Sequence, residues 1–150
     1  MAEPANSALS TPELTRQVTR GVCRYLSDLG YSVLTEFTLR NGRRADVIAL
    51  GDDGSVVIVE VKVSVADLKA DRKWPEYDDF CDRLFFATPR DFPLERLPPA
   101  CGILVADQWG ADEIRAARTA PLHASRRRVF ILKFARQAAQ RLYDLTNPRI

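Results

Sequence analysis

Glu60 and Lys62 stand two residues apart in an otherwise apolar run, Val56–Val63, and they are the clearest candidates for chemistry in this sequence. The run is short and rich in β-branched residues, which predicts a strand. Because side chains alternate along a strand, the two charged groups share one face and most of the valines take the other. A single pattern of this kind is weak, because half-exposed sheets also carry such pairs as ordinary solvated residues.

A second carboxylate is expected opposite the first. The turn Gly51–Ser55 separates this run from a strand expected over about 43–50, and pairing Leu50 with Val56 places Asp46 directly across from Glu60. Opposed carboxylates have Cβ atoms about 4.5–5.5 Å apart and repel each other unless positive charge lies between them. The pattern therefore predicts a cation site, with Lys62 next to it on the same face.

Two further glutamates are weaker candidates. Asn41-Gly42 is a strong hairpin signal, and a two-residue loop there would put Phe37, not Glu36, opposite Asp46. Glu36 therefore stays open as a possible further metal ligand. Glu13 is interpreted as the return half of a capping box that begins at Ser10.

The surrounding elements are predicted from hydrophobic periodicity and turn signals. The expected order is α-β-β-β-α-β, then a further strand and a C-terminal helix. The expected ranges are a helix at about 11–29, strands at about 31–39, 43–50 and 56–63, a helix after Ser64 that Pro75 ends or kinks, strands at 84–87 and 102–106, and a helix from near Ser125. This order predicts an α/β domain with a mixed sheet.

Composition limits the classes of protein to consider. With 150 residues, 46% hydrophobic and 28% charged, we expect a disordered lead-in over 1–9 and one domain over 10–150. No apolar stretch reaches the roughly 18 residues of a membrane span, and the N-terminus does not have the form of a secretion signal, so we expect a soluble, cytoplasmic protein. Three scattered cysteines and one histidine disfavour zinc, which leaves a hard cation held by carboxylates.

Positive charge gathers at the C-terminal end. Residues 126–150 hold seven basic residues and one acidic residue, a net +6, so the remainder carries −4. Arg126, Arg127 and Arg128 open this segment as candidate phosphate contacts, although a solvated helix face explains the charge equally well.

Other candidate DNA contacts lie nearer the carboxylates. Arg43 and Arg44 precede Asp46, and Lys69, Lys73 and Tyr77 follow at helical spacing; the alternative for the last three is a solvated helix. Trp74 could stack on a base, but a tryptophan beside a proline is more often a packing residue.

The combined pattern resembles the PD-(D/E)XK nuclease superfamily, which includes many restriction enzymes and Holliday-junction resolvases. Within it, about Thr15 to Leu145 is similar to the MmcB family, whose members are proposed to be DNA-repair endonucleases. The resemblance is carried by Arg44-Ala45-Asp46-Val47-Ile48-Ala49-Leu50, Val59-Glu60-Val61-Lys62, Asp71-Arg72-Lys73-Trp74-Pro75-Glu76-Tyr77 and Cys81-Asp82-Arg83-Leu84-Phe85-Phe86-Ala87. Ala45 stands where the superfamily motif has proline, a residue that is not a metal ligand.

The resemblance implies a restriction-endonuclease-like, three-layer core that cleaves DNA with Mg²⁺ or Mn²⁺. Asp46, Glu60 and the Val61 carbonyl would hold the metal, and Lys62 would orient water and stabilise charge on the phosphate. No small-molecule cofactor or membrane partner is expected, and a homodimer is possible. The alternative is a nucleic-acid-binding module that keeps the fold but does not cleave; a protein that binds no nucleic acid is a third possibility.

Overall fold

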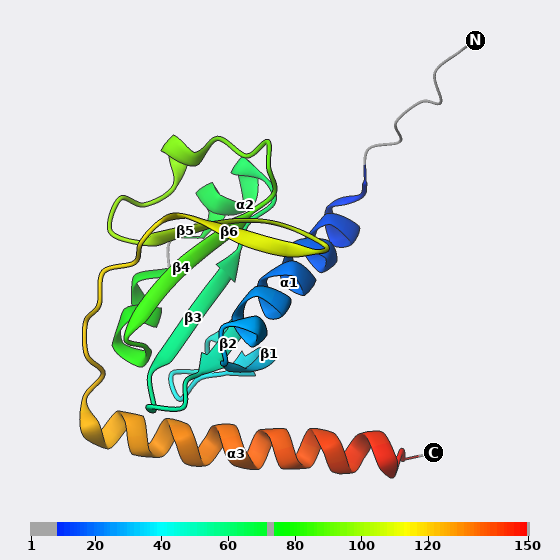
Figure 1. Cartoon of the computed structure of the whole chain (residues 1–150), viewed down its shortest axis with the longest axis vertical. Coiled ribbons are helices and arrows are strands. Elements are labelled where there is room, and N and C mark those ends of the chain that lie inside the picture. Colours follow the sequence, from blue (N-terminus) through cyan, green and yellow to red (C-terminus); the bar gives the residue numbers. More distant parts are fainter. Residues whose placement is uncertain (1–8, 72–73, 150) are drawn as a thin grey trace.

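The computed structural model describes residues 9–71 and 74–149. Its α-helices and strands follow the expected order with one added strand (Figure 1). They are α1 (Thr11–Asp28), β1 (Ser32–Thr38), β2 (Arg44–Leu50), β3 (Val56–Val61), α2 (Val65–Ala70), the 3-10 helix η1 (Trp74–Phe80), β4 (Arg83–Thr88), the short 3-10 turn η2 (Leu94–Arg96), β5 (Gly102–Asp107), β6 (Gly110–Arg115) and α3 (Ala124–Thr146). The expected lead-in falls largely on residues 1–8, which lie outside the described residues.

One six-stranded mixed sheet forms the centre of the molecule, with its strands in chain order from β1 to β6. The first three strands form the expected antiparallel meander, and β3, β4 and β5 run parallel. β6 returns antiparallel along β5 and was not predicted, because its sequence, GADEIR, has the polar character of an exposed edge strand. Every residue of β3 is buried, as expected of a central strand that is covered on both faces.

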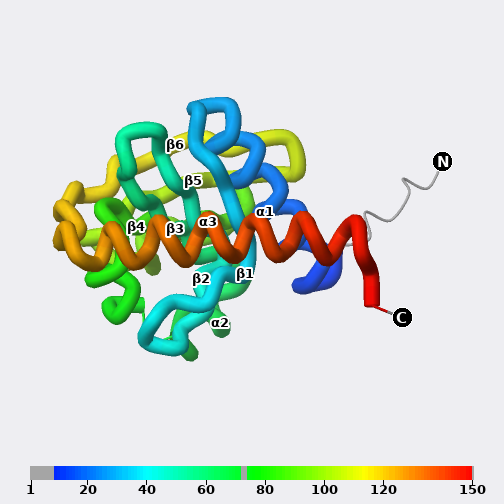
Figure 2. The backbone as a smooth tube through the Cα atoms, turned by 90° about the horizontal axis from the view of Figure 1, so that it is seen from below, coloured from blue at the N-terminus to red at the C-terminus, as the bar shows by residue number. Residues whose placement is uncertain are grey.

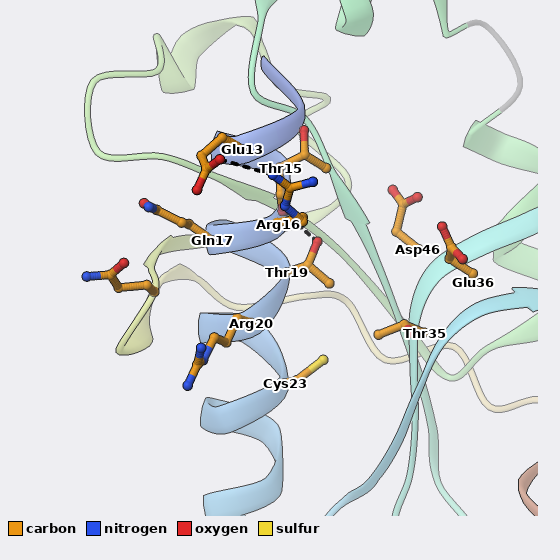
Figure 3. Close-up of a pocket in the computed structure, with 11 residues that line it drawn as sticks. Glu13, Thr15, Arg16, Gln17, Thr19, Arg20, Cys23, Thr35, Glu36 and Asp46 are labelled. Carbon is orange, nitrogen blue, oxygen red and sulfur yellow. Dashed lines mark hydrogen bonds and ion pairs between the residues drawn. The ribbon is translucent and has the colours of Figure 1, made fainter. Parts of the chain in front are cut away.

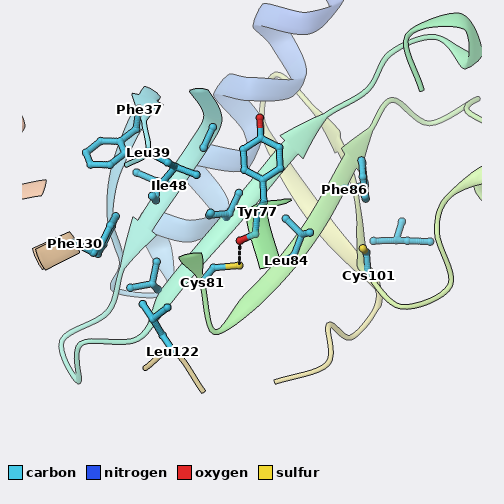
Figure 4. Close-up of a cluster of buried hydrophobic side chains, with 14 of the residues drawn as sticks. Phe37, Leu39, Ile48, Tyr77, Cys81, Leu84, Phe86, Cys101, Leu122 and Phe130 are labelled. Carbon is cyan, nitrogen blue, oxygen red and sulfur yellow. Dashed lines mark hydrogen bonds between the residues drawn. The ribbon is translucent and has the colours of Figure 1, made fainter. Parts of the chain in front are cut away.

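Two hydrophobic cores lie on the two faces of the sheet. α1 covers one face, where Val18 and Val22 pack on Val57 and Val59 (Figure 1). The other face packs Phe37, Ile48 and Phe86 against α2, η1 and the start of α3 (Figure 4). The expected alternation along β3 is therefore correct, because Val57 and Val59 face α1 while Ile58 faces the opposite core.

Asp82 anchors the C-terminal helix to the sheet. Its carboxylate accepts hydrogen bonds from the main-chain N–H groups of Val56 and Leu122, both at 2.7 Å. It also forms a two-pronged ion pair with Arg127, in which both nitrogen–oxygen distances are 2.7 Å. The helix then runs beneath the sheet and beyond it (Figure 2), and Phe130 and Phe134 are its buried residues.

The segment between β3 and β4 is less helical than expected. α2 ends at Ala70, and the chain resumes at Trp74 as a 3-10 helix rather than as a continuation of α2. Pro75 explains the change, because proline disrupts an α-helix interior and disfavours the helical conformation in the residue before it. In the part of the chain that is described, we find no helix that combines the length and apolar character of a membrane span.

Candidate functional site

Asp46 and Glu60 face each other at the end of the β2–β3 ladder. The observed pairs run from Leu50–Val56 to Val47–Val59, and this register, if continued, brings Asp46 opposite Glu60. The register predicted from the turn length is therefore confirmed. Beyond Val47–Val59, hydrogen bonds from main chain to side chain take the place of main-chain pairing. Glu60 Oε1 accepts the Asp46 N–H at 3.2 Å, and Asp46 Oδ2 accepts the Val61 N–H at 2.8 Å.

The electrostatics of this pair favour a bound cation. Glu60 is only 4% exposed. Burial raises the pKa of Glu60 to about 9; the charge of Asp46 and a hydrogen bond between the two carboxyl groups add to the rise, while the Asp46 N–H and Lys62 oppose it. Burial beside Asp46 therefore favours the protonated form of Glu60 in the absence of a cation, and a divalent ion would take the place of that proton.

Strand geometry predicts that the main-chain oxygen of Val61 points toward the same place. The N–H and C=O of one strand residue project to the same side of the strand. Because the Val61 N–H reaches Asp46, the Val61 carbonyl also projects toward β2, while the next N–H, that of Lys62, bonds the Ala87 oxygen of β4 at 2.9 Å. The predicted metal ligands thus come from the two strands that meet at this point.

Lys62 is held by an acidic partner from the segment after α2. Its ammonium nitrogen lies 2.8 Å from Asp71 Oδ2, and the two side chains are 13% and 16% exposed. The sequence did not assign a role to Asp71, although it begins one of the stretches that carry the family resemblance. A charged residue soon after the strand that carries Glu60 and Lys62 was the available signal, but only the fold shows that it returns to Lys62.

The hairpin between β1 and β2 corrects the predicted position of Glu36. Leu39 donates to the Arg43 oxygen at 2.7 Å, so the loop has three residues instead of two. Gly42, with φ of 84°, supplies the left-handed residue that such a loop needs. The register then places Glu36, not Phe37, opposite Asp46.

Glu36 and Asp46 both line a cleft of about 590 Å³ between α1 and the sheet, with Glu13 on the helix side (Figure 3). Within the described residues, no three His, Cys, Asp or Glu side chains converge closely enough to hold a metal by themselves. A cation bound by Asp46 and Glu60 would therefore need oxygens from the main chain, water or phosphate to complete its shell.

Glu13 performs one half of its predicted capping role. Its main-chain N–H donates to the Ser10 hydroxyl oxygen at 3.3 Å, so Ser10 caps α1 as expected. The Glu13 carboxylate, however, pairs with Arg16 at 3.0 Å.

Several candidate DNA contacts also have partners within the protein. Arg127 is committed to Asp82, and Arg126 donates to the Asp79 carbonyl at 2.9 Å and lies over the Phe80 ring. The charge of Arg127 is thus balanced by the buried Asp82 carboxylate, whereas the Arg126 side chain is 49% exposed. Arg128 remains exposed.

Of the residues predicted to share one polar helical face, Lys69 and Tyr77 lie in separate helices and do not share a face. Lys69 is exposed on α2, whereas Tyr77 is only 7% exposed in the separate 3-10 helix and donates its hydroxyl hydrogen to the Arg44 oxygen at 3.1 Å. Lys73 lies outside the described residues. Trp74 packs edge-on against Phe86, so it has the packing role that sequence favoured.

Arg43 and Arg44 lie beside the carboxylates, and they differ in whether they are paired with an acidic residue. Arg43 forms an ion pair with Glu76 at 2.6 Å, and Arg44 is exposed at the start of β2. Of these two residues, Arg44 is thus the better placed for phosphate.

Comparison with known proteins places the chain in a family. A family model described as DNA repair protein MmcB-like matches residues 2–149. Among solved structures, a protein of unknown function from Silicibacter pomeroyi is 42% identical, with a TM-score of 0.86 over 89% of this chain and 92% of that one. A comparison with curated proteins finds no match.

Proposed function

This chain belongs to the MmcB-like family of DNA repair proteins, and from that membership and its paired carboxylates we propose that it is a Mg²⁺-dependent DNA endonuclease. One observation carries the proposal: a buried glutamate and an aspartate are held face to face, with a lysine two residues further along. A buried pair of like charges is costly unless a cation lies between them.

Asp46, Glu60 and the Val61 carbonyl would hold the metal, and this all-oxygen donor set suits Mg²⁺ or Mn²⁺. When bound, such a metal polarises the scissile phosphate and lowers the pKa of water. Asp46 and Glu60 supply negative charge at fixed positions, because each accepts a main-chain N–H from the opposing strand segment.

Lys62 supplies positive charge to the phosphate. Asp71 fixes the direction of its side chain, and its low exposure strengthens the field that it exerts on a nearby oxyanion. Lys62 would also orient the attacking water by donating a hydrogen bond to it. This arrangement stabilises the charge that develops on the phosphate oxygens as the phosphodiester bond breaks.

The test is cleavage of supercoiled plasmid and of branched DNA in Mg²⁺, in Mn²⁺ and in EDTA. We expect cleavage only with metal, and its loss in Asp46→Ala and Lys62→Ala. Arg118→Ala serves as a control for the loss of one positive charge, because Arg118 is an exposed arginine in the segment after β6. Binding without cutting under all conditions would favour the non-cleaving alternative, and normal cutting by folded Asp46→Ala would reject the assignment.

A further inference from the structure

Helix α1 presents polar and basic side chains to the cleft that contains Asp46. Thr15, Arg16, Thr19 and Arg20 line its helical side, opposite Glu36 and Asp46 from the sheet (Figure 3). In Figure 3 Thr15 and Thr19 lie on the side of the helix toward Asp46, while the Arg20 guanidinium extends away from it, so basic groups flank the cleft and suit a polyanion that enters it.

Three arginines continue this surface along the helix. Arg16, Arg20 and Arg24 follow at intervals of four residues and are all exposed, so they form one stripe, which we call the arginine stripe. The ion pair of Arg16 with Glu13 joins side chains that are 72% and 47% exposed. Such exposed pairs are weak, so a phosphate can replace Glu13 as the partner of Arg16.

An exposed aromatic ring lies at the end of the arginine stripe. Trp109 is 68% exposed at the β5–β6 turn, and the Arg24 guanidinium lies 5.9 Å from its ring centre. The neighbouring residue in the turn, Gln108, lines the cleft. The stripe, the cleft and the tryptophan therefore form one continuous surface.

The turn that carries Trp109 is held rigidly. Asp107 Oδ1 accepts the N–H groups of Trp109 at 2.8 Å and Gly110 at 3.2 Å. α1 packs directly against this turn, because a Cβ on Gly21 would lie 1.7 Å from the Asp107 carbonyl oxygen. The main chain at Trp109 therefore has little conformational freedom to lose on binding.

We infer that a single-stranded segment of DNA binds along α1, with its phosphates on Arg16 and Arg20 and a base stacked on Trp109. The choice of DNA as the ligand rests on the proposed function. The single strand follows from the ring, because only an unpaired base offers a free face for stacking. Asp112 and Glu113, whose charges reach Tyr25, do not line the cleft, so we expect the DNA to follow the cleft side of α1 toward Asp46.

The test is fluorescence anisotropy in EDTA, where binding is separated from cleavage, using a labelled single strand of about 20 nucleotides, longer than typical sites of roughly 4–16. For Arg16→Ala/Arg20→Ala we expect weaker binding and a salt slope smaller by about 1.4, from about 0.7 per phosphate contact. Trp109→Ala should weaken binding by about 5- to 150-fold, while Trp109→Phe retains most of the affinity.

Matched controls separate binding along the arginine stripe from a general effect of positive charge. Arg118→Ala/Arg136→Ala also removes two exposed arginines, but from other surfaces, and it should change the affinity less. Quenching of tryptophan fluorescence on binding should be present in the wild type and lost in Trp109→Phe, because Trp74, the other tryptophan, is packed against Phe86.

The inference is overturned if the arginine variant binds no worse than the control, if Trp109→Ala binds as wild type, or if a duplex of equal length binds better than the single strand. Parallel cleavage assays keep the two proposals apart. If the wild type cuts DNA normally and the α1 and Trp109 substitutions do not change binding, only the proposed DNA-binding surface along α1 is rejected. If these variants lose binding but the wild type does not cut DNA, the nuclease proposal is rejected and the DNA-binding surface along α1 is supported.

Discussion

Replacing Glu60 by glutamine tests the central physical claim about the site. Glutamine keeps the size of the side chain and an oxygen that can accept the Asp46 N–H, but it cannot ionise. In the wild type without metal, the buried Glu60 must either keep its proton or place a second negative charge beside Asp46. The substitution removes that conflict together with one metal ligand.

The size and sign of the effect follow from linkage. The pKa of Glu60 rises from an ordinary 4.5 to about 9 on folding, so the folded state binds the proton more tightly than the unfolded state does. A raised pKa favours the folded state fully below 4.5, and this contribution is lost as the pH rises toward 9. At about 1.36 kcal/mol per pH unit, the wild type should lose about 3 kcal/mol between roughly pH 6 and pH 8. Glu60→Gln should lose almost none of it.

The assay is urea unfolding followed by circular dichroism, in EDTA and then with Mg²⁺. Magnesium should stabilise the wild type more at the higher pH, because it binds the ionised pair, and should stabilise Glu60→Gln much less. The pH stays below 9, since burial raises the pKa of the Cys101 thiol to about 11 and ionisation of unfolded cysteine would add its own pH dependence. Glu95→Gln, an exposed glutamate on η2, is the control. An equal pH slope in the wild type and Glu60→Gln would refute the argument.

Three further substitutions test how the site and the fold are held. Asp71→Asn should keep the fold but lower the rate of DNA cleavage by about 10- to 100-fold, because Lys62 loses the carboxylate that positions it; single-turnover kinetics would measure this effect. Asp82→Ala should cost about 3–5 kcal/mol in urea unfolding, since it leaves Arg127 and two main-chain N–H groups without their shared acceptor. Burial alone would raise the pKa of Asp82, but Arg127 and these N–H groups hold it at about 2, so its contribution should be lost as the pH falls from 3.8 through about 2. Gly21→Ala should destabilise the protein by about 1–3 kcal/mol or more and lower its melting temperature, because the new Cβ would overlap the Asp107 carbonyl.

The sequence predicted the central part of the fold because its signals there are local. The capped start of α1, the β-branched run of β3 and the turn Gly51–Ser55 each depend on neighbouring residues, and together they placed Asp46 opposite Glu60. β6 was not predicted, because an exposed edge strand has no buried face and therefore shows no apolar alternation.

Charged residues were harder to interpret, because charge in a sequence does not reveal its partner. Arg127 belongs to a basic run that suggested phosphate binding, yet its partner Asp82 lies 45 residues earlier in the chain. Arg16 and Arg20, by contrast, are ordinary residues of an amphipathic helix in the sequence. Only the packing of α1 on the sheet shows that they line the cleft with Asp46.

The access of Asp46 to this cleft depends on a local irregularity that periodicity could not foresee. In a regular strand, residues two apart share a face, but Val47 packs in the core beneath α1 while Ala45 packs in the opposite core. The reversal occurs where Glu36, the residue opposite Asp46, adopts φ of 49° and has its carbonyl bound by Arg141 at 3.1 Å. Positive φ is costly for a residue other than glycine and is concentrated at functional sites. Because Asp46 lies where β2 changes face, its carboxyl group contacts the buried Glu60 and Val61 and still lines the open cleft. A DNA strand bound along α1 could thus reach this carboxylate pair, which regular alternation along β2 would have enclosed in the protein core.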